Sequence, residues 1–104
     1  MRDTLGEFEH QVLLAVLRLG GETYSVPVVM ELEQRTGREV SQAQVFIVLS
    51  RLEAKAMLTS RFVEDAGGRK RRYFRTTPRA VKRLRETRRE LKRLWEGLGP
   101  VLES

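Results

Sequence analysis

The stretch SQAQVFIVLSRLEAKAML, residues 41–58, decides the fold of this chain. Its apolar residues recur at spacings of three and four, as expected for one buried stripe on an α-helix. They are Val45, Val48, Leu49 and Leu52. Ser41 is a favourable N-cap, and Gln44 stands three residues later, where a capping box places its second partner. The stretch therefore predicts an amphipathic helix that begins at Ser41.

Gln42 and Gln44 stand in the first turn of this predicted helix, away from its apolar stripe. A glutamine amide carries both donors and acceptors, which are the groups needed to contact the edge of a base. A helix that buries one side and presents amides from its N-terminal turn is typical of the recognition helix of a helix-turn-helix. On this stretch alone, an ordinary amphipathic core helix remains the alternative.

Two shorter helices are predicted before this one. The first begins at Thr4 and ends at residues 20–21, and residues 22–24 form a short connector. The second is capped by Ser25 and ends at Gly37, since glycine readily takes the left-handed conformation that closes a helix. A helix, a short turn that contains glycine and another helix together form a helix-turn-helix.

A basic hairpin is predicted after these helices. Residues 59–63 and 73–76 have a β-type composition, and Gly67 and Gly68 between them allow a sharp reversal. Four consecutive cations, residues 69–72, follow the glycines, and we expect them at a solvated tip that pairs with phosphates. Such a hairpin after a helix-turn-helix is a wing. A soluble basic loop without a partner is the alternative.

The last helix is predicted to begin at Thr77 and Pro78 and to carry a heptad-spaced seam for a partner helix. The seam comprises Val81, Leu84, Leu91, Trp95, Leu98 and Leu102, and Arg88 interrupts it. The helix would span on the order of 30 Å, which is longer than a small three-helix core requires. We therefore expect a fold that is mainly α with a small β-hairpin: a winged helix-turn-helix over residues 1–77 and a dimerisation helix over residues 78–104.

The net charge of +6 is distributed unevenly along the chain. Residues 1–57 hold 6 Lys/Arg and 8 Asp/Glu, whereas residues 58–104 hold 14 and 6. This asymmetry indicates a polyanionic partner, with nucleic acid ahead of a membrane surface, and a solvated basic face without a partner is the alternative. The longest apolar run, residues 12–17, is too short to cross a bilayer. The absence of cysteine fits a reducing cytoplasm, so we expect a cytoplasmic protein without a membrane partner.

The composition argues against an enzyme. The chain has no cysteine and a single histidine, His10, and it contains no phosphate-loop pattern and no metal-ligand spacing. The acidic residues stand mostly beside Arg or Lys on expected helix surfaces, where solvated ion pairs explain them. We expect no catalytic site, metal or cofactor, and we expect His10 at a surface or an interface.

Taken in order, these motifs resemble the PadR family of transcriptional regulators over nearly the whole chain. Residues 43–46, Ala-Gln-Val-Phe, and residues 51–53, Arg-Leu-Glu, are similar to the recognition helix of the family. Residues 5–9 resemble its opening helix, and residues 68–78 resemble its wing and second strand. The order and spacing of the motifs carry the resemblance, rather than any single one.

The sequence departs from the family pattern at four positions. Phe46 stands where tyrosine is usual and has no hydroxyl for a phosphate, and Gln44 replaces a threonine. Ala43 and Ala56 stand where glycine is common. Either the base preference differs from that of better-known members, or Phe46 simply packs.

The resemblance implies a two-fold dimer that represses transcription by binding double-stranded DNA at a near-palindromic operator. The residues expected at the DNA are Tyr24, Ser41, Gln42, Gln44, Phe46, Arg69, Lys70 and Arg71. In some short members, flat aromatic drugs bind at the dimer interface against a tryptophan. Trp95, Arg88 and Leu91 are the corresponding candidates for such an effector, and packing in the dimer core is the alternative for Trp95.

Two other functions stay open at the level of the sequence. A winged-helix protein-interaction module would use the basic wing to bind an acidic protein partner, and indifference to DNA at moderate salt would favour it. Non-specific binding or RNA binding ranks lower, because beyond Tyr73 and Phe74 the predicted sheet has no exposed row of aromatic rings on which bases could stack.

Overall fold

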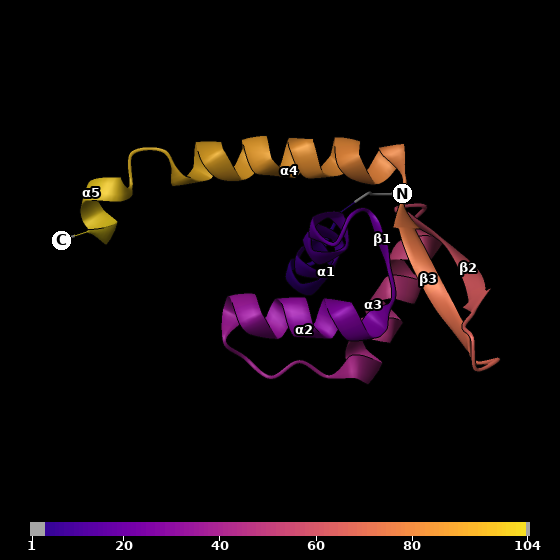
Figure 1. The fold of residues 1–104 in the computed structure, drawn as a ribbon. Helices are drawn as coiled ribbons and strands as arrows, with labels where there is room; N and C mark the ends of the chain where they lie inside the picture. The colour runs from indigo at the N-terminus through magenta and orange to yellow at the C-terminus, as the bar shows by residue number, and fades with distance from the viewer. Residues whose placement is uncertain (1–3, 104) are drawn as a thin grey trace.

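The computed structural model describes residues 4–103, which form a mainly helical fold with a small sheet. The elements in chain order are α1 (Glu7–Arg18), β1 (Glu22–Thr23), α2 (Ser25–Thr36), α3 (Gln42–Ala54), β2 (Leu58–Glu64), β3 (Lys70–Thr76), α4 (Pro78–Trp95) and α5 (Gly99–Leu102). The strands form one antiparallel sheet in the order β1-β3-β2. The β2–β3 hairpin projects from the group formed by α1, α2 and α3, and α4 passes over α1 (Figure 1). This is the fold class that the sequence predicts.

The core lies between the three helices and the root of the hairpin. Its largest buried side chains are Val12, Leu13, Val16, Val28, Leu32, Val45, Val48, Leu49, Leu52, Met57, Leu58, Phe74 and Leu84. All four members of the stripe predicted on α3 are among them, which confirms the amphipathic helix. Phe74 on β3 is fully buried, so it ties the hairpin to the helices.

The structure confirms most of the predicted ends of α2 and α3. Ser41 is the N-cap of α3, and its hydroxyl accepts a hydrogen bond from the Gln44 N–H at 3.2 Å. Gly37 ends α2 in the left-handed conformation, with a φ of 72°. The prediction for Ser25 is wrong by one residue, since Ser25 is already helical and the extended Tyr24 is the N-cap residue.

The predicted start of α1 at Thr4 is wrong. The helix begins at Glu7, and Gly6 is its N-cap residue. The Glu9 carboxylate accepts hydrogen bonds from the Gly6 N–H at 2.8 Å and from Lys55 Nζ at 2.7 Å. Lys55 Nζ also donates to the Thr4 carbonyl at 3.0 Å. These contacts hold the chain before Gly6 against the end of α3, so it does not join the helix.

A short strand lies in the segment that the sequence predicts to be a connector. Glu22 pairs with Arg75 and Thr23 pairs with Phe74, which places β1 beside β3. A strand of two residues has no periodicity of its own, so only its pairing with a distant segment defines it. The prediction of a connector over residues 22–24 is therefore corrected.

The hairpin has longer strands and a less basic turn than predicted. β2 and β3 pair over their full lengths, and residues 65–69 connect them. The Asp65 carboxylate accepts hydrogen bonds from the N–H groups of Gly67 and Arg69, both at 2.9 Å. The prediction of four cations at the tip is therefore wrong, because only Arg69 lies in the turn and residues 70–72 belong to β3.

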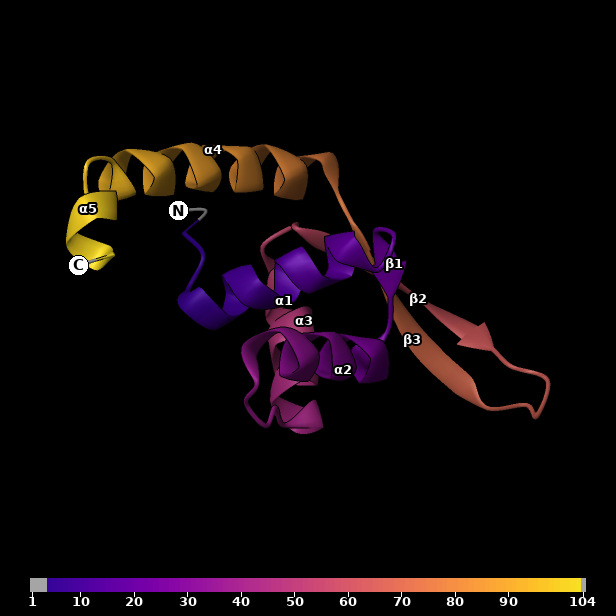
Figure 2. The same ribbon diagram turned by 60° about the vertical axis from the view of Figure 1, so that its left-hand side comes forward.

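The C-terminal helix extends beyond the helical core. Ala80 and Leu84 are its buried residues, and every residue in the range 88–103 is exposed. Figure 2 shows α4 running past the N-terminal end of α1, with α5 turned back at its far end. The radius of gyration is 15.5 Å, against about 13 Å for a compact chain of this length. No helix within residues 4–103, α4 included, has the length and apolar character needed to cross a membrane.

Candidate nucleic-acid interface

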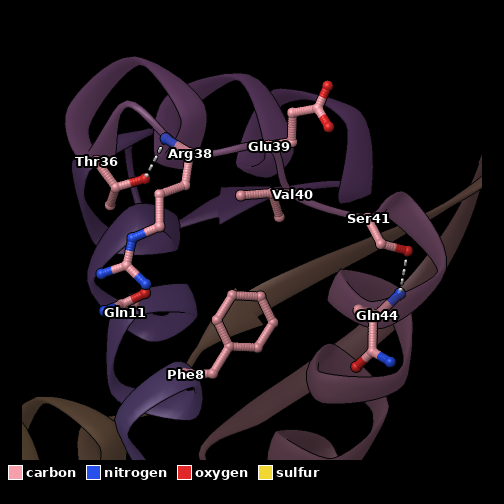
Figure 3. A pocket seen from close by; sticks show the side chains of 8 residues that line it. All are labelled: Phe8, Gln11, Thr36, Arg38, Glu39, Val40, Ser41 and Gln44. Carbon is pink, nitrogen blue, oxygen red and sulfur yellow. Dashed lines mark hydrogen bonds between the residues drawn. The ribbon is translucent and has the colours of Figure 1, made fainter.

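The first turn of α3 presents polar side chains to solvent. Ser41, Gln42 and Gln44 are exposed, but residues two apart on a helix point about 200° apart. Gln42 faces α2, where its Nε2 donates to the Ser25 hydroxyl at 3.4 Å. Gln44 faces a different hollow of about 240 Å³, which Phe8 of α1 also lines (Figure 3). The structure therefore does not bring the two predicted base-contacting residues together.

A cationic hollow of about 310 Å³ lies between the start of α2, α3 and the hairpin. We call it the α3–wing hollow, and its lining consists of Tyr24, Ser25, Val26, Gln42, Phe46, Arg69, Arg71 and Arg72. It unites five of the residues that the sequence places at the DNA, namely Tyr24, Gln42, Phe46, Arg69 and Arg71. Ser41, Gln44 and Lys70 lie outside it.

Tyr24 and Arg71 form an ordered corner of the α3–wing hollow. The guanidinium carbon of Arg71 lies 4.9 Å from the centroid of the Tyr24 ring, within the range of a cation–π contact. The Tyr24 ring also packs on Tyr73 of β3, with their centroids 5.2 Å apart. The guanidinium and the phenol hydroxyl that meet at this corner are both donors suited to a phosphate oxygen.

Arg72 connects the wing to α3 instead of facing the open hollow. Its Nη2 donates to a Glu53 carboxylate oxygen at 2.6 Å, and its Nε donates to the Ser60 hydroxyl at 3.1 Å. Its guanidinium carbon lies 5.1 Å from the Phe74 ring centroid. The charge of Arg72 is thus balanced within the protein by the Glu53 carboxylate. No local signal in the sequence marks Glu53, which is 19 residues away, as the partner.

Phe46 packs and also remains part of the surface. Its ring meets Phe74 edge-on, with the centroids 5.9 Å apart and the planes at 77°. It nevertheless keeps 39% of its area exposed, at the wall of the α3–wing hollow. The phenylalanine at this position therefore has a packing partner that does not require a hydroxyl.

A further cation of the hairpin is neutralised within the sheet. The Arg61 guanidinium donates to both Glu22 oxygens, at 2.8 Å and 3.2 Å. These hydrogen bonds and the charge of Arg61 lower the pKa of Glu22, and the same pair raises the pKa of Arg61. Because Arg61 and Arg72 are both paired, the hairpin cations that line the open part of the α3–wing hollow are Arg69 and Arg71.

A second, apolar hollow of about 340 Å³ lies between α1 and α4, and we call it the α1–α4 trough. Its lining consists of His10, Leu14, Leu17, Val81, Leu84, Arg85, Arg88 and Leu91. Two of the residues predicted to hold an effector, Arg88 and Leu91, lie here, whereas Trp95 is on the next turn of α4 and is 57% exposed. Burial lowers the pKa of His10, whose Nδ1 has no hydrogen-bond partner in the described part of the chain.

Comparison with known proteins identifies relatives of this chain. Residues 13–86 match the model of the family described as the transcriptional regulator PadR-like family. A PadR family transcriptional regulator from Eggerthella lenta is similar over 89% of this chain and 81% of that one, with 27% identity and a TM-score of 0.72. A PadR family transcription regulator from Clostridium difficile is similar over 93% of this chain and 99% of that one, with 16% identity and a TM-score of 0.78.

The fold also occurs outside proteins that carry the PadR name. A winged-helix DNA-binding protein from STIV is similar over 85% of this chain and 90% of that one, with 16% identity and a TM-score of 0.65. No curated protein matches the sequence. The comparisons therefore agree on a winged-helix fold.

Proposed function

The chain belongs to the PadR-like family of transcriptional regulators, and from this premise we propose that it is a homodimeric, sequence-specific repressor that acts in the cytoplasm. Proteins of this family regulate transcription and are not enzymes. The observation that carries the proposal is the α3–wing hollow, where polar groups of α3 meet the cations of the hairpin. A duplex suits such a surface, because its major groove accepts a helix while its phosphates meet the wing.

In this proposal the N-terminal turn of α3 enters the major groove. Gln42 and Gln44 contact base edges on different sides of the helix, and Ser41 with the first N–H groups of α3 holds a phosphate. Replacing either glutamine with alanine is expected to relax base choice at one position, by about 1–3 kcal/mol. The separation of the two glutamines predicts that they affect different base pairs.

The wing and the start of α2 supply the backbone contacts in this proposal. Arg69, Lys70 and Arg71 contact phosphates or the minor groove, and the Tyr24 hydroxyl donates to a phosphate beside Arg71. Phe46 contributes to the wall of the site through its exposed edge. Contacts of this kind fix the position of α3 on the duplex without reading sequence.

The dimer is proposed to form through α4 and the segment that follows it. Leu91 and Trp95 of α4 lie on the predicted seam, as do Leu98 and Leu102 beyond its end, and all four are exposed in the single chain. Water would cover this apolar area unless a second subunit buries it, and such burial favours association. Residues 1–77 would then form the DNA-binding part and residues 78–104 the dimerisation part. Residues 1–3 and 104 fall outside the described residues.

We also propose that a flat aromatic ligand relieves repression where the α1–α4 trough meets the partner subunit. Arg88 and Leu91 line the trough, and Trp95 follows on the same helix. Trp95 is the single tryptophan of the chain, so intrinsic tryptophan fluorescence reports on this place alone. Quenching together with release of DNA supports the proposal, and ligand binding that leaves Trp95 emission and DNA affinity unchanged contradicts it.

The central experiment is selection of duplexes from a random library by the purified protein, followed by binding of the selected duplex over a series of salt concentrations. An inverted repeat with half-sites about one helical turn apart is expected from a two-fold dimer. If no motif emerges and weak binding disappears with salt, the proposal fails. In that case the basic wing of a protein-interaction module becomes the better explanation.

A further inference from the structure

The outward side of α3, between its two glutamines, is apolar. Ala43 and Ile47 stand four residues apart and therefore share one face of the helix. Ile47 is two residues from both Val45 and Leu49, so it points about 200° away from each of these buried side chains. It is 50% exposed, which leaves a branched apolar side chain on the side of α3 opposite the core.

This apolar face continues into the cationic α3–wing hollow. Ala43, Phe46 and Ile47 line a shallow hollow of about 490 Å³ together with Ser25 and Gln42. Ser25, Gln42 and Phe46 also line the α3–wing hollow, so the two surfaces share an edge. Single apolar side chains are common on protein surfaces, but a contiguous apolar face beside clustered cations indicates a partner with both features. That partner is a polyanion that also exposes apolar groups.

Double-stranded DNA offers one such apolar group in its major groove. The C5-methyl of thymine projects there, whereas the other major-groove features are hydrogen-bond donors and acceptors. Ile47 has no polar atom in its side chain, so packing it on a donor or acceptor would remove that group from water without a partner. Packing it on the thymine methyl removes two apolar surfaces from water together.

We propose that Ile47, supported by Ala43, is a specificity-determining residue that packs on the methyl group of a thymine in each half-site. The inference rests on the proposed function, because it requires α3 to lie in a major groove. It gives α3 three distinct contacts across its exposed side: an amide on each flank and an apolar contact between them.

The experiment uses the duplex that the wild-type protein selects from a random library. Each thymine of a half-site is replaced in turn by deoxyuridine, which pairs identically and lacks only the methyl group. The wild-type protein is expected to bind one of these duplexes about fourfold more weakly, the effect of losing one buried methyl. The I47A variant is expected to bind the thymine duplex more weakly and to lose this discrimination, whereas I47V retains most of it.

The R69A variant is the matched control for affinity. It is expected to bind the thymine and deoxyuridine duplexes equally more weakly, so their affinity ratio stays at the wild-type value. I47A is expected to stay folded, because Ile47 is half exposed and alanine has the higher helix propensity. Circular dichroism melting of both variants checks this.

Four results separate the outcomes. Loss of the thymine preference in I47A but not in R69A supports the inference. A selected duplex that tolerates deoxyuridine at every position, or an I47A variant that keeps the wild-type ratio, overturns the inference and leaves the proposed function intact. Failure to select any duplex overturns the proposed function, and the inference falls with it.

Discussion

Ala56 has a backbone conformation that favours glycine. Its φ is 62°, and it follows α3 in a turn where the Met57 N–H donates to the Leu52 carbonyl and the Ala56 N–H donates to the Glu53 carbonyl. This pair of hydrogen bonds is the Schellman motif, which usually has glycine at this position. The left-handed conformation costs a residue with a Cβ about 1–2 kcal/mol.

Replacing Ala56 with glycine is therefore expected to stabilise the protein. The strain relieved in the folded state is offset in part by the extra entropy that glycine gives the unfolded chain, about 0.4–1 kcal/mol, so the net gain in stability lies between about 0 and 1.6 kcal/mol. Urea unfolding measures it. The control is A54G two residues earlier, in the helical part of α3, which should destabilise by about 0.5–1 kcal/mol. Equal destabilisation by A56G and A54G would contradict the argument.

Glu9 makes the stability of the folded protein depend on pH. Burial alone raises the pKa of Glu9, but the hydrogen bonds from Lys55 and the Gly6 N–H, with the charges of Lys55 and Arg51, lower it below its ordinary value of 4.5. The unfolded state thus binds more protons than the folded state near this pH, so stability rises with pH there. The contribution is present above pH 4.5 and is lost as the pH falls through the lowered pKa.

The E9Q variant is expected to lose part of this acid dependence and to be less stable by about 1–3 kcal/mol at neutral pH, because Lys55 Nζ then bonds an uncharged group. Urea unfolding over a series of pH values measures both effects. The control is E7Q, which removes the same charge from the first turn of α1 at an exposed position. It should lower the free energy of unfolding by less than E9Q does. Wild-type and E9Q unfolding free energies that fall in parallel with acid would refute the role of Glu9.

At the scale of the elements, the wing contains cations that are paired with a carboxylate and cations that line an open hollow. Arg61 is paired with Glu22, whereas Arg69 lines the α3–wing hollow. R69A is expected to weaken binding to all duplexes alike and to reduce the salt slope of log K by about 1, the effect of one lost phosphate contact. R61A should reduce the slope less, because Glu22 already balances its charge. If both variants change the slope equally, the distinction between paired and open cations is wrong.

The elements that the sequence predicts well are those with local determinants. The stripe of α3, its Ser41 cap and the Gly37 stop of α2 each depend on residues within one or two turns. The start of α1 does not follow from local sequence, because Glu9 is held by Lys55, 46 residues away. The same holds for β1, since its pairing partners on β3 lie more than fifty residues later.

The candidate site was predicted to a similar extent. The basic wing and the exposed turn of α3 follow from composition and helical period. The pairing of Arg72 with Glu53 does not, because it joins a strand to a helix through tertiary structure. The opposite directions of Gln42 and Gln44, and the outward position of Ile47, do follow from the period of 3.6 residues. Chain geometry alone could therefore have revealed them.

At the scale of the whole molecule, the single chain is extended where a partner is expected. Its principal extents are 55 × 32 × 21 Å, and α4 accounts for the elongation in both ribbon views (Figures 1 and 2). An Arg-rich helix with an exposed apolar seam is stable in water mainly when another surface covers that seam. The shape thus leads to a prediction about assembly.

The protein is expected to sediment as a dimer, and L91R is expected to dissociate it. Leu91 lies on the seam and lines the α1–α4 trough. In a two-fold interface each dimer carries the substitution twice, so the association free energy falls by about 3 kcal/mol or more. The dissociation constant therefore rises by about a hundredfold. L94R is the matched control, because Leu94 is on the same helix, is 72% exposed and lies off the seam. Sedimentation velocity over a concentration series measures both variants. A monomeric wild-type protein, or equal dissociation by L91R and L94R, would show that this seam does not form the dimer.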